Sequence, residues 1–204
     1  MKNTMPQRIK LFTLMALATI SLHLAAYSPA DTVIAFDIHD VLMQSRIDKM
    51  MGKFLKNPSL ILKVGQLSDG SYGDNPKLRK IINSQKPICE TWNLIKKLKT
   101  AGYSLYIFSN IDKTAFDELK AKFPAYFSLF DDYHVVHNND AKQKKPAPSA
   151  YDSCRTMIEK SHPGKRIIFV DDKKENIQAA CKAGFRGIHF TSAEKLTVKL
   201  KVLL

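Results

Sequence analysis

The sequence predicts an α/β protein with a doubly wound (Rossmann-like) parallel sheet and a small helical cap insertion. Two observations support this fold class: short apolar runs alternate with amphipathic stretches, and polar residues follow several of these runs directly. The chain has 204 residues, of which 45% are hydrophobic and 25% charged, so its composition fits one main globular domain. Composition therefore excludes disorder, collagen-like repeats and a multi-span membrane protein.

Five apolar runs are the predicted strands, and amphipathic segments between them are the predicted helices. The strands cover residues 33–36, 104–108, 134–136, 167–170 and 187–190. The helices cover residues 91–100, 113–122, 147–159 and 174–183. In the first helix Trp92, Ile95 and Leu98 share one face, and Gly102 follows as a stop signal. Asp172 stands where it could cap the last helix.

Residues 44–86 separate the first two predicted strands and are too many for a simple crossover. They include GQLSDGSYGDNP, in which glycine, aspartate and proline interrupt any helix or strand. We interpret this segment as a small, mostly helical cap inserted into a core of residues 31–43 and 87–204. Open α/β sheets bind ligands at the carboxyl ends of their strands, so a cap that leaves the first strand would cover the site.

Residues 1–30 have the three-part layout of a secretory signal peptide. Three basic residues and no acidic one precede an apolar run at residues 11–26, and Ser28 and Ala30 are small residues suited to cleavage. The run is shorter than the roughly twenty residues of a membrane span. We therefore predict a mature chain beginning at Asp31, periplasmic or secreted, without a stable membrane span. The alternatives are an uncleaved membrane anchor and a packed first helix.

The chain is strongly basic, with 32 Lys and Arg against 19 Asp and Glu and a formal charge of +13. Without the predicted leader, 29 basic residues and a charge of +10 remain. Such a balance suits nucleic acid, an anionic membrane surface or a phosphorylated substrate. Neither a basic stripe with interleaved aromatic residues nor a known binding module is present, so we predict no nucleic-acid partner. We interpret the lysine clusters at residues 142–145 and 195–201 as solvated faces.

The cysteines Cys89, Cys154 and Cys181 are too few for a disulfide scaffold in a chain of this length. Export would place them in an oxidising compartment. Because Cys154 and Cys181 fall within predicted helices, we expect buried thiols there rather than a bridge.

Three of the predicted strands end in polar residues of the kinds that a phosphoryl-transfer site needs. They are Asp37 after the first strand, Ser109 and Asn110 after the second, and Asp171 and Asp172 after the fourth. Lys145, directly before a proline, lies between the second and third of these groups. One strand ending in aspartate means little, but four such pieces in this order are specific.

In this order and spacing, the residues resemble the motifs of the haloacid dehalogenase superfamily, in particular its phosphatase-like branch with a cap after the first motif. The resemblance covers residues 33–190 and is strongest in FSNIDKTAFDELK, KKPAPSAYD and IFVDDKKENIQAACKAGF. It implies a hydrolase of phosphorylated small molecules in which Asp37 is the nucleophile. It also implies that Ser109 and Asn110 bind the transferred phosphoryl group and that Lys145 neutralises it.

The resemblance further implies a Mg²⁺ site at the strand ends. Asp37, Asp172 and the backbone carbonyl of His39 would contact the ion, while Asp171 would act behind them, toward the lysine. Asn176 is placed to orient the acidic pair. A carboxylate nucleophile divides hydrolysis into two displacements, and a cation must offset its repulsion from phosphate. Mg²⁺ prefers such oxygen ligands.

One position departs from the family's pattern. Two residues after the nucleophile these phosphatases carry an aspartate that protonates the leaving group, whereas this chain has His39, followed by Asp40. In an extended chain Asp37 and His39 share a face and Asp40 does not, so Asp40 is a poor substitute unless the turn tightens. With an ordinary pKa of about 6.5, histidine is itself a competent general acid and base.

The sequence thus predicts a Mg²⁺-dependent phosphohydrolase that acts through an aspartyl-phosphate intermediate, with histidine replacing the second aspartate. One alternative is a catalytically weakened protein that still binds phosphate and metal. The other is a hydrolase of the same superfamily with different chemistry. The dehalogenase branch also lacks the second aspartate, but it needs no magnesium pair, so Asp171 and Asp172 argue against it.

Overall fold

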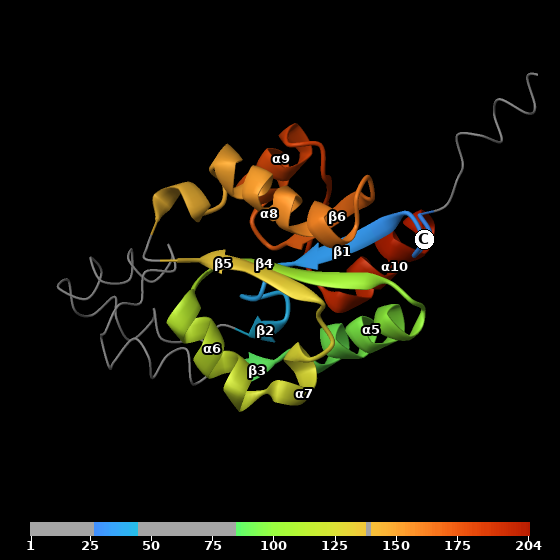
Figure 1. The fold of residues 1–204 in the computed structure, drawn as a ribbon. Helices are drawn as coiled ribbons and strands as arrows, with labels where there is room; N and C mark the ends of the chain where they lie inside the picture. Colours follow the sequence, from blue (N-terminus) through green and yellow to red (C-terminus); the bar gives the residue numbers. More distant parts are fainter. Residues whose placement is uncertain (1–26, 45–84, 138–139) are drawn as a thin grey trace, which may run out of the picture.

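A five-stranded parallel sheet with helices on both faces forms the centre of the molecule (Figure 1). The computed structural model describes residues 27–44, 85–137 and 140–204. In this part of the chain the strand order is β5-β4-β1-β6-β7, and each neighbouring pair is parallel. The predicted doubly wound α/β fold is confirmed.

Each of the five predicted strands is present, with ends shifted by a few residues. Their bounds are β1 (Thr32–Phe36), β4 (Ser104–Asp112), β5 (Asp132–Val136), β6 (Arg166–Asp171) and β7 (Arg186–His189). β4 runs beyond its predicted end, and its register with β5 shifts between Ser109 and Asp112. The polar residues expected after the second strand therefore lie within β4, where the pairing becomes irregular.

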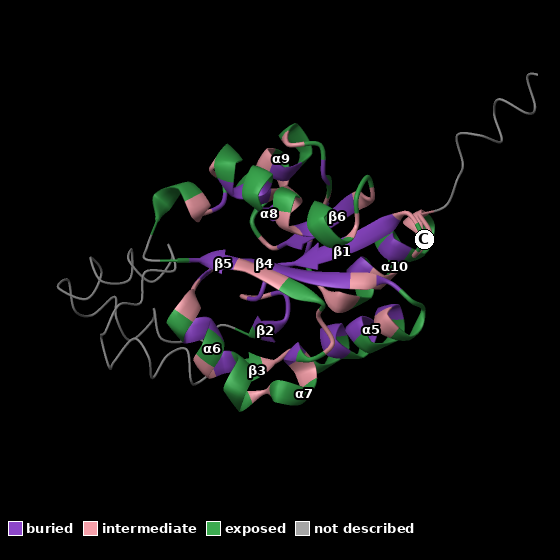
Figure 2. Cartoon of the chain, in the orientation of Figure 1, coloured by how far each residue is buried: buried purple, intermediate pink, exposed green. Residues whose placement is uncertain are grey.

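The helices form two layers. On one face of the sheet lie α5 (Cys89–Thr100), α6 (Lys113–Lys122), α7 (Pro124–Phe127) and α10 (Ala193–Leu203), and on the other lie α8 (Pro148–Ser161) and α9 (Lys174–Lys182) (Figure 1). Ile34 and Phe36 of β1 pack toward the first layer, Val33 and Ala35 toward the second. β1 is consequently buried along its whole length (Figure 2). In the described part of the chain, no helix is long and apolar enough to cross a membrane.

The terminal helix α10 was not predicted. Ser192 caps it by accepting a hydrogen bond from the Lys195 amide at 3.2 Å, and Leu196 and Leu200 are buried in the core shared with α5. The predicted lysine cluster at residues 195–201 lies on this helix, with Lys195, Lys199 and Lys201 exposed. The helix was not evident from the sequence because lysines alternate there with aliphatic residues. In the structure the apolar side chains on one side of the helix hold it against the core.

The two ends of the segment predicted as a cap pair with each other. β2 (Met43–Gln44) pairs antiparallel with β3 (Lys86–Pro87), and a short 3₁₀ helix, η1 (Ala141–Gln143), follows later in the chain. Trp92 Nε1 on α5 donates to the Leu42 carbonyl at 2.8 Å, which fixes the loop after β1 against the core. The cap itself, apart from its paired ends, and most of the predicted leader lie outside the described residues.

Cys89, Cys154 and Cys181 are free, and for the last two this was expected. Cys154 is buried, and burial raises the pKa of its thiol to about 12. The expectation of a buried Cys181 was wrong: this residue is exposed, because α9 turns Asn176 and Ala180 toward the core instead.

Candidate active site

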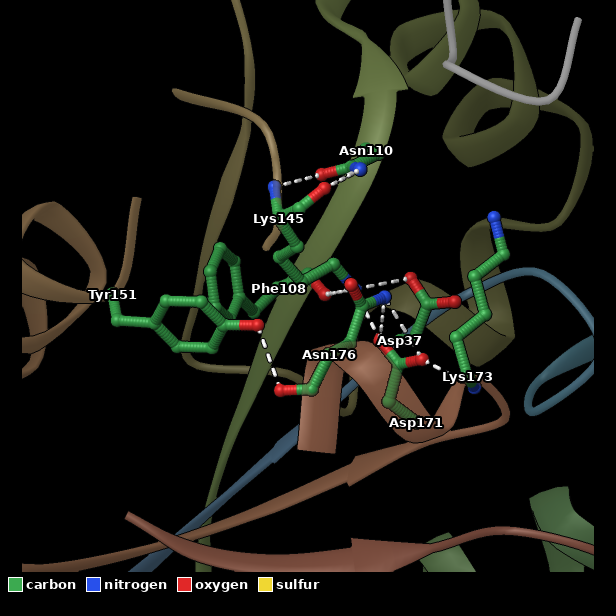
Figure 3. Close-up of polar contacts among 8 residues, drawn as sticks. All are labelled: Asp37, Phe108, Asn110, Lys145, Tyr151, Asp171, Lys173 and Asn176. Carbon is green, nitrogen blue, oxygen red and sulfur yellow. Dashed lines mark hydrogen bonds and ion pairs between the residues drawn. The ribbon is translucent and has the colours of Figure 1, made fainter. Parts of the chain in front are cut away.

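The side chain of Lys145 joins the carboxyl ends of three neighbouring strands. Its Nζ donates to Asp37 Oδ1 at 2.9 Å, to Asp171 Oδ2 at 2.6 Å and to the Phe108 carbonyl at 2.8 Å (Figure 3). An ammonium group has three N–H donors, and each meets an oxygen here. Burial opposes the charged form, but Asp171 and Asp37 outweigh it and raise the pKa of Lys145. The site therefore holds a permanent buried positive charge.

Asn110 on β4 fixes the backbone of Lys145. Its Oδ1 accepts from the Lys145 amide at 2.7 Å, and its Nδ2 donates to the Lys145 carbonyl at 2.8 Å (Figure 3). The rings of Phe108 and Phe169 lie beneath Nζ, with centroids 5.1 and 4.9 Å away. In the structure the amide group of Asn110 positions the lysine, and its expected contact with substrate stays a prediction.

Asp171 is completely buried and accepts hydrogen bonds from three residues. Besides Lys145, the Lys173 amide donates to Oδ1 at 2.8 Å, and Asn176 Nδ2 lies 3.1 Å from Oδ1 and 3.0 Å from Oδ2 (Figure 3). Burial raises the pKa of Asp171, and the charge of Asp37 adds to this effect against the opposing attraction of Lys145. Asp171 thus lies where the sequence placed it, behind the site and against the lysine.

Two details at the start of α9 differ from expectation. The predicted N-cap Asp172 was wrong, because the residue before the helix is Lys173 and the carboxylate bonded to its amide belongs to Asp171. Asn176, expected to orient the acidic pair, donates from Nδ2 to Asp171, while its own carbonyl accepts from Tyr151 Oη at 2.8 Å. Asp172 Oδ1 is left without a hydrogen-bond partner among the described residues.

Asp37 follows β1 directly and projects into the same group of charges. Its amide donates to the Val170 carbonyl at 2.9 Å, which continues the pairing of β1 with β6. Burial alone would raise the pKa of Asp37, but the neighbouring charge of Lys145 outweighs it and lowers the pKa. Asp37 is therefore ionised at neutral pH, as a carboxylate nucleophile must be.

Three carboxylates converge at this edge of the sheet. Asp37, Asp171 and Asp172 each offer an oxygen, and these oxygens lie within 4.8 Å of one another. Asp172 Oδ1 is buried without a hydrogen-bond partner in the described chain. Burial, together with the charges of Asp37 and Asp171, raises the pKa of Asp172 to about 7. A hard divalent cation such as Mg²⁺ would coordinate the unpaired oxygen of Asp172 and offset the repulsion among the three carboxylates. The residues therefore fit that ion.

Ser109 on β4 contributes a second orphaned polar atom. Its side chain is buried, and its Oγ has no hydrogen-bond partner of normal geometry among the described residues, although it lies near enough to Asp37 to help lower the pKa of that carboxyl. β4 pairs directly with β1, so Ser109 lies one strand away from Asp37 at the same edge. A buried hydroxyl without a partner is costly, and an anionic ligand beside Asp37 would accept its hydrogen bond.

His39 lies in a tight turn after Asp37. Its backbone bridges to Met43, and Asp40 adopts a left-handed conformation with φ of 55° while its amide donates to the Met43 carbonyl at 2.8 Å. The chain therefore bends where an extended segment was assumed. His39 is half-buried, and its burial lowers the pKa of the imidazole although Asp37 and Asp40 act against this. Neutral imidazole is the main form at pH 7.

Comparison with known families assigns this arrangement. Residues 30–190 match the family of haloacid dehalogenase-like hydrolases. The chain belongs to this family. The match includes β1, β4, β6 and every residue of the Lys145 network, so the predicted family is confirmed.

Among curated proteins, this hydrolase is similar to the sesquiterpene phosphatase astK of Aspergillus oryzae. The two are 28% identical over 126 residues, which cover 62% of this chain and 62% of that protein. The hydrolase thus matches less than two thirds of its relative's length.

Solved structures share the fold of this hydrolase. A haloacid dehalogenase-like hydrolase from Streptococcus pneumoniae has a TM-score of 0.56 at 16% identity, with 79% of this chain and 85% of that chain covered. An L-2-haloacid dehalogenase from Xanthobacter autotrophicus, with chloropropionic acid covalently bound, has a TM-score of 0.56 at 16% identity, covering 83% and 82%. These likenesses show the fold alone.

One residue that contacts the site of this hydrolase was missed from the sequence. His189, the last residue of β7, places Nε2 2.9 Å from the Asp172 carbonyl oxygen. Since a carbonyl only accepts, Nε2 carries the proton of this hydrogen bond. The signal was available, because His189 is a polar residue near the carboxyl end of a predicted strand.

Proposed function

We propose that this hydrolase is a Mg²⁺-dependent phosphatase that acts on a phosphorylated small molecule through an aspartyl-phosphate intermediate. The observation that carries the proposal is the convergence of three carboxylates with one buried lysine, beside an orphaned serine hydroxyl. Similarity to a curated phosphatase supports the same choice.

Asp37 would attack the phosphorus atom. Lys145 holds its Oδ1, so we assign the attack to Oδ2. The new O–P bond forms as the bond to the leaving alcohol breaks, and the leaving oxygen takes up a proton. Water then attacks the phosphorus of the aspartyl phosphate, releases inorganic phosphate and restores the carboxylate.

The other site residues would offset the negative charges of the phosphate and of Asp37. Asp37, Asp172 and the His39 carbonyl would hold Mg²⁺, which would offset the charge between carboxylate and phosphate. Lys145 places a fixed positive charge beside Asp37, and the Ser109 hydroxyl would donate to a phosphoryl oxygen. Asp171 anchors Lys145 by a 2.6 Å ion pair and would stay behind the reaction. Such preorganised groups stabilise charge that develops in the transition state.

Turnover of a phosphoester panel tests the function directly. We expect inorganic phosphate to be released from at least one phosphorylated small molecule, in the presence of Mg²⁺ and not of EDTA. The same preparation receives 2-chloropropionate, with chloride release as the readout, because a neighbour of the same fold carries that acid covalently. Chloride release without phosphate release would reverse the assignment, and tight phosphate binding without turnover would leave a binding protein.

Replacing His39 with Asp is expected to raise kcat by about tenfold at pH 7, part of the 10²–10⁴-fold that a positioned general acid contributes. The lowered pKa of His39 leaves it mainly neutral, and neutral imidazole is a poor proton donor to the leaving group. Burial and the neighbouring carboxylates raise the pKa of Asp172 to about 7, and the same surroundings should let an aspartic acid at position 39 keep a proton that it can donate. His39→Asn is the matched control, since it neither donates nor accepts a catalytic proton and should slow turnover. A rate for His39→Asp at or below that of the native chain would show that the histidine is a tuned acid and base.

Magnesium is expected to stabilise the folded protein. At a concentration a hundred times its Kd, a ligand that binds only the folded state adds about 2.7 kcal/mol, a rise in Tm of about 5–10 °C for a domain of this size. Asp172→Asn should abolish this rise while leaving the metal-free Tm unchanged or higher, because it removes one of three crowded carboxylates. Asp152→Asn, on the exposed side of α8, is the control. Equal Mg²⁺ responses in both variants would contradict the assigned site.

A further inference from the structure

The outward face of α10 carries two exposed valines. Val198 and Val202 are 58% and 81% exposed, and they are the large exposed hydrophobic side chains among the described residues. Four residues apart on a helix, they are neighbours on one face. Leu196 and Leu200 point the opposite way and are buried. The helix is therefore apolar on two sides, one packed on the core and one facing solvent.

Lysines flank the exposed valines. Lys195, Lys199 and Lys201 are all exposed on α10, and Lys199 Nζ donates to the His189 carbonyl at 2.9 Å. Apolar side chains between lysines on the free face of a helix are typical of segments that lie on the surface of an anionic membrane. A nucleic-acid partner would explain the lysines but not the exposed valines. A protein partner would be expected to bind a helix face with a larger exposed apolar area.

The start of the described chain is fastened to the end of this helix. The Tyr27 amide donates to the Leu203 carbonyl at 2.8 Å, and the Tyr27 carbonyl accepts from Tyr103 Oη at 2.8 Å. The Arg166 guanidinium lies 3.9 Å from the centroid of the Tyr27 ring. The first described residue, Tyr27, is therefore hydrogen-bonded to the carboxyl end of α10.

Residues 27–30 belong to the folded body. In addition to the contacts of Tyr27, the Pro29 carbonyl accepts from Lys165 Nζ at 3.0 Å, and the Ser28 amide donates to Asp31 Oδ1 at 3.0 Å. Cleavage after Ala30, the site suggested by the sequence pattern, would remove all of these contacts. The contacts favour a chain that keeps this junction beside α10.

The active site lies at the other end of the sheet. Tyr27 and Leu203 lie where β1 begins, whereas Asp37 follows the end of β1, so the two places are separated by the length of the strand (Figure 1). α10 itself begins close behind the carboxyl end of β7, where Ala193 and Glu194 line one pocket with Asp40, so only its carboxyl-terminal part lies away from the site. A bilayer against that part and the start of β1 would leave the carboxyl ends of the strands accessible to substrate.

We propose that the outward face of α10, made of Val198, Val202 and their flanking lysines, docks on an anionic lipid bilayer. Charge complementarity attracts the lysines to acidic headgroups, and the valines enter the interface. The inference is independent of the phosphatase proposal, since it involves none of the site residues.

Lysine footprinting of the full chain tests the docking. The protein is mixed with vesicles of phosphatidylcholine alone, or with vesicles that also contain phosphatidylglycerol, and a water-soluble acylating reagent is added. We expect acylation of Lys195 and Lys201 to slow on the order of fivefold on the anionic vesicles, the contribution of one lysine beside such a surface. Lys160 and Lys182, exposed on the opposite layer, should be acylated equally on both. Residues 11–26 are present with both kinds of vesicle, so any insertion of that run into lipid would not by itself make acylation differ between them.

A variant pair separates docking from net charge. Val198→Asp with Val202→Asp places two acids on the α10 face and should abolish the protection, whereas Ser153→Asp with Thr156→Asp adds the same charge to the exposed side of α8 and should preserve it. All four positions are exposed, so folding is expected to be retained. Equal acylation on both vesicles, equal protection of Lys160 and Lys182, or protection that survives in the α10 variant would each overturn the proposal.

Discussion

Replacement of Lys145 by Met is expected to destabilise the metal-free protein by about 3–5 kcal/mol, the cost of removing one partner from a buried ion pair. Lys145 Nζ contacts both Asp37 and Asp171, and all three side chains are buried. Without the ammonium group, two carboxylates would face each other across a space filled by a methionine. Few single substitutions in this protein would leave so much uncompensated charge inside the fold.

Urea unfolding in EDTA measures this loss, because bound Mg²⁺ would offset part of it. Lys142→Met, an exposed neighbour on η1, is the control and should change the free energy of unfolding by no more than about 0.5 kcal/mol. Adding Asp37→Asn to Lys145→Met removes one of the two stranded charges, so the double variant should recover about 0.5–3 kcal/mol. A double variant less stable than Lys145→Met would show that packing, rather than charge, is the role of the lysine.

Replacement of Asp37 by Asn is expected to lower kcat by about 10⁴-fold or more, the scale observed when a catalytic nucleophile is lost. The amide has nearly the same shape as the carboxylate but cannot form the aspartyl phosphate. Asn at this position can still accept from Lys145 Nζ, which also keeps Asp171 and the Phe108 carbonyl as partners. The fold should therefore survive while turnover disappears.

Phosphate release under saturating substrate and Mg²⁺ measures this effect, with thermal unfolding as the check on folding. Asp152→Asn, an equal change on the exposed side of α8, should retain native turnover. Activity of Asp37→Asn within tenfold of the native chain would mean that another group attacks phosphorus, and the aspartyl-phosphate mechanism would be abandoned.

Much of the site could be predicted from where polar residues end apolar strands. Asp37, Ser109 and Asp171 were found because parallel strands bring their carboxyl ends to one edge of a sheet. Lys145 lies in no strand and was found only through resemblance to a family of known motif order. The structure places all four at one edge of the sheet, with a common ion-pair network around the lysine.

Other features could not be predicted from local pattern. Asn110 binds the backbone of Lys145, which lies 35 residues further along the chain. The sequence does not show that these two residues are close in space. Asp172 was wrongly predicted as the N-cap of α9 because Asp171 and Asp172 are adjacent and either could accept from the Lys173 amide. In the structure Lys145 and Asn176 bind Asp171, and it is Asp171 that accepts from this amide. α10 was missed because its lysines obscure the stripe of Leu196 and Leu200.

The sequence alone determined the alternating architecture, the family and the identities of the charged groups, because hydrophobic periodicity and motif order are local properties of the chain. The tertiary structure decided which charges meet. It showed that one buried ammonium serves both Asp37 and Asp171, that His39 sits in a bent rather than an extended segment, and that Tyr27 is fastened to the end of α10. The physical reason is that electrostatic energy and burial depend on distances in space, and residues 108 positions apart such as Asp37 and Lys145 acquire theirs only when the sheet has formed.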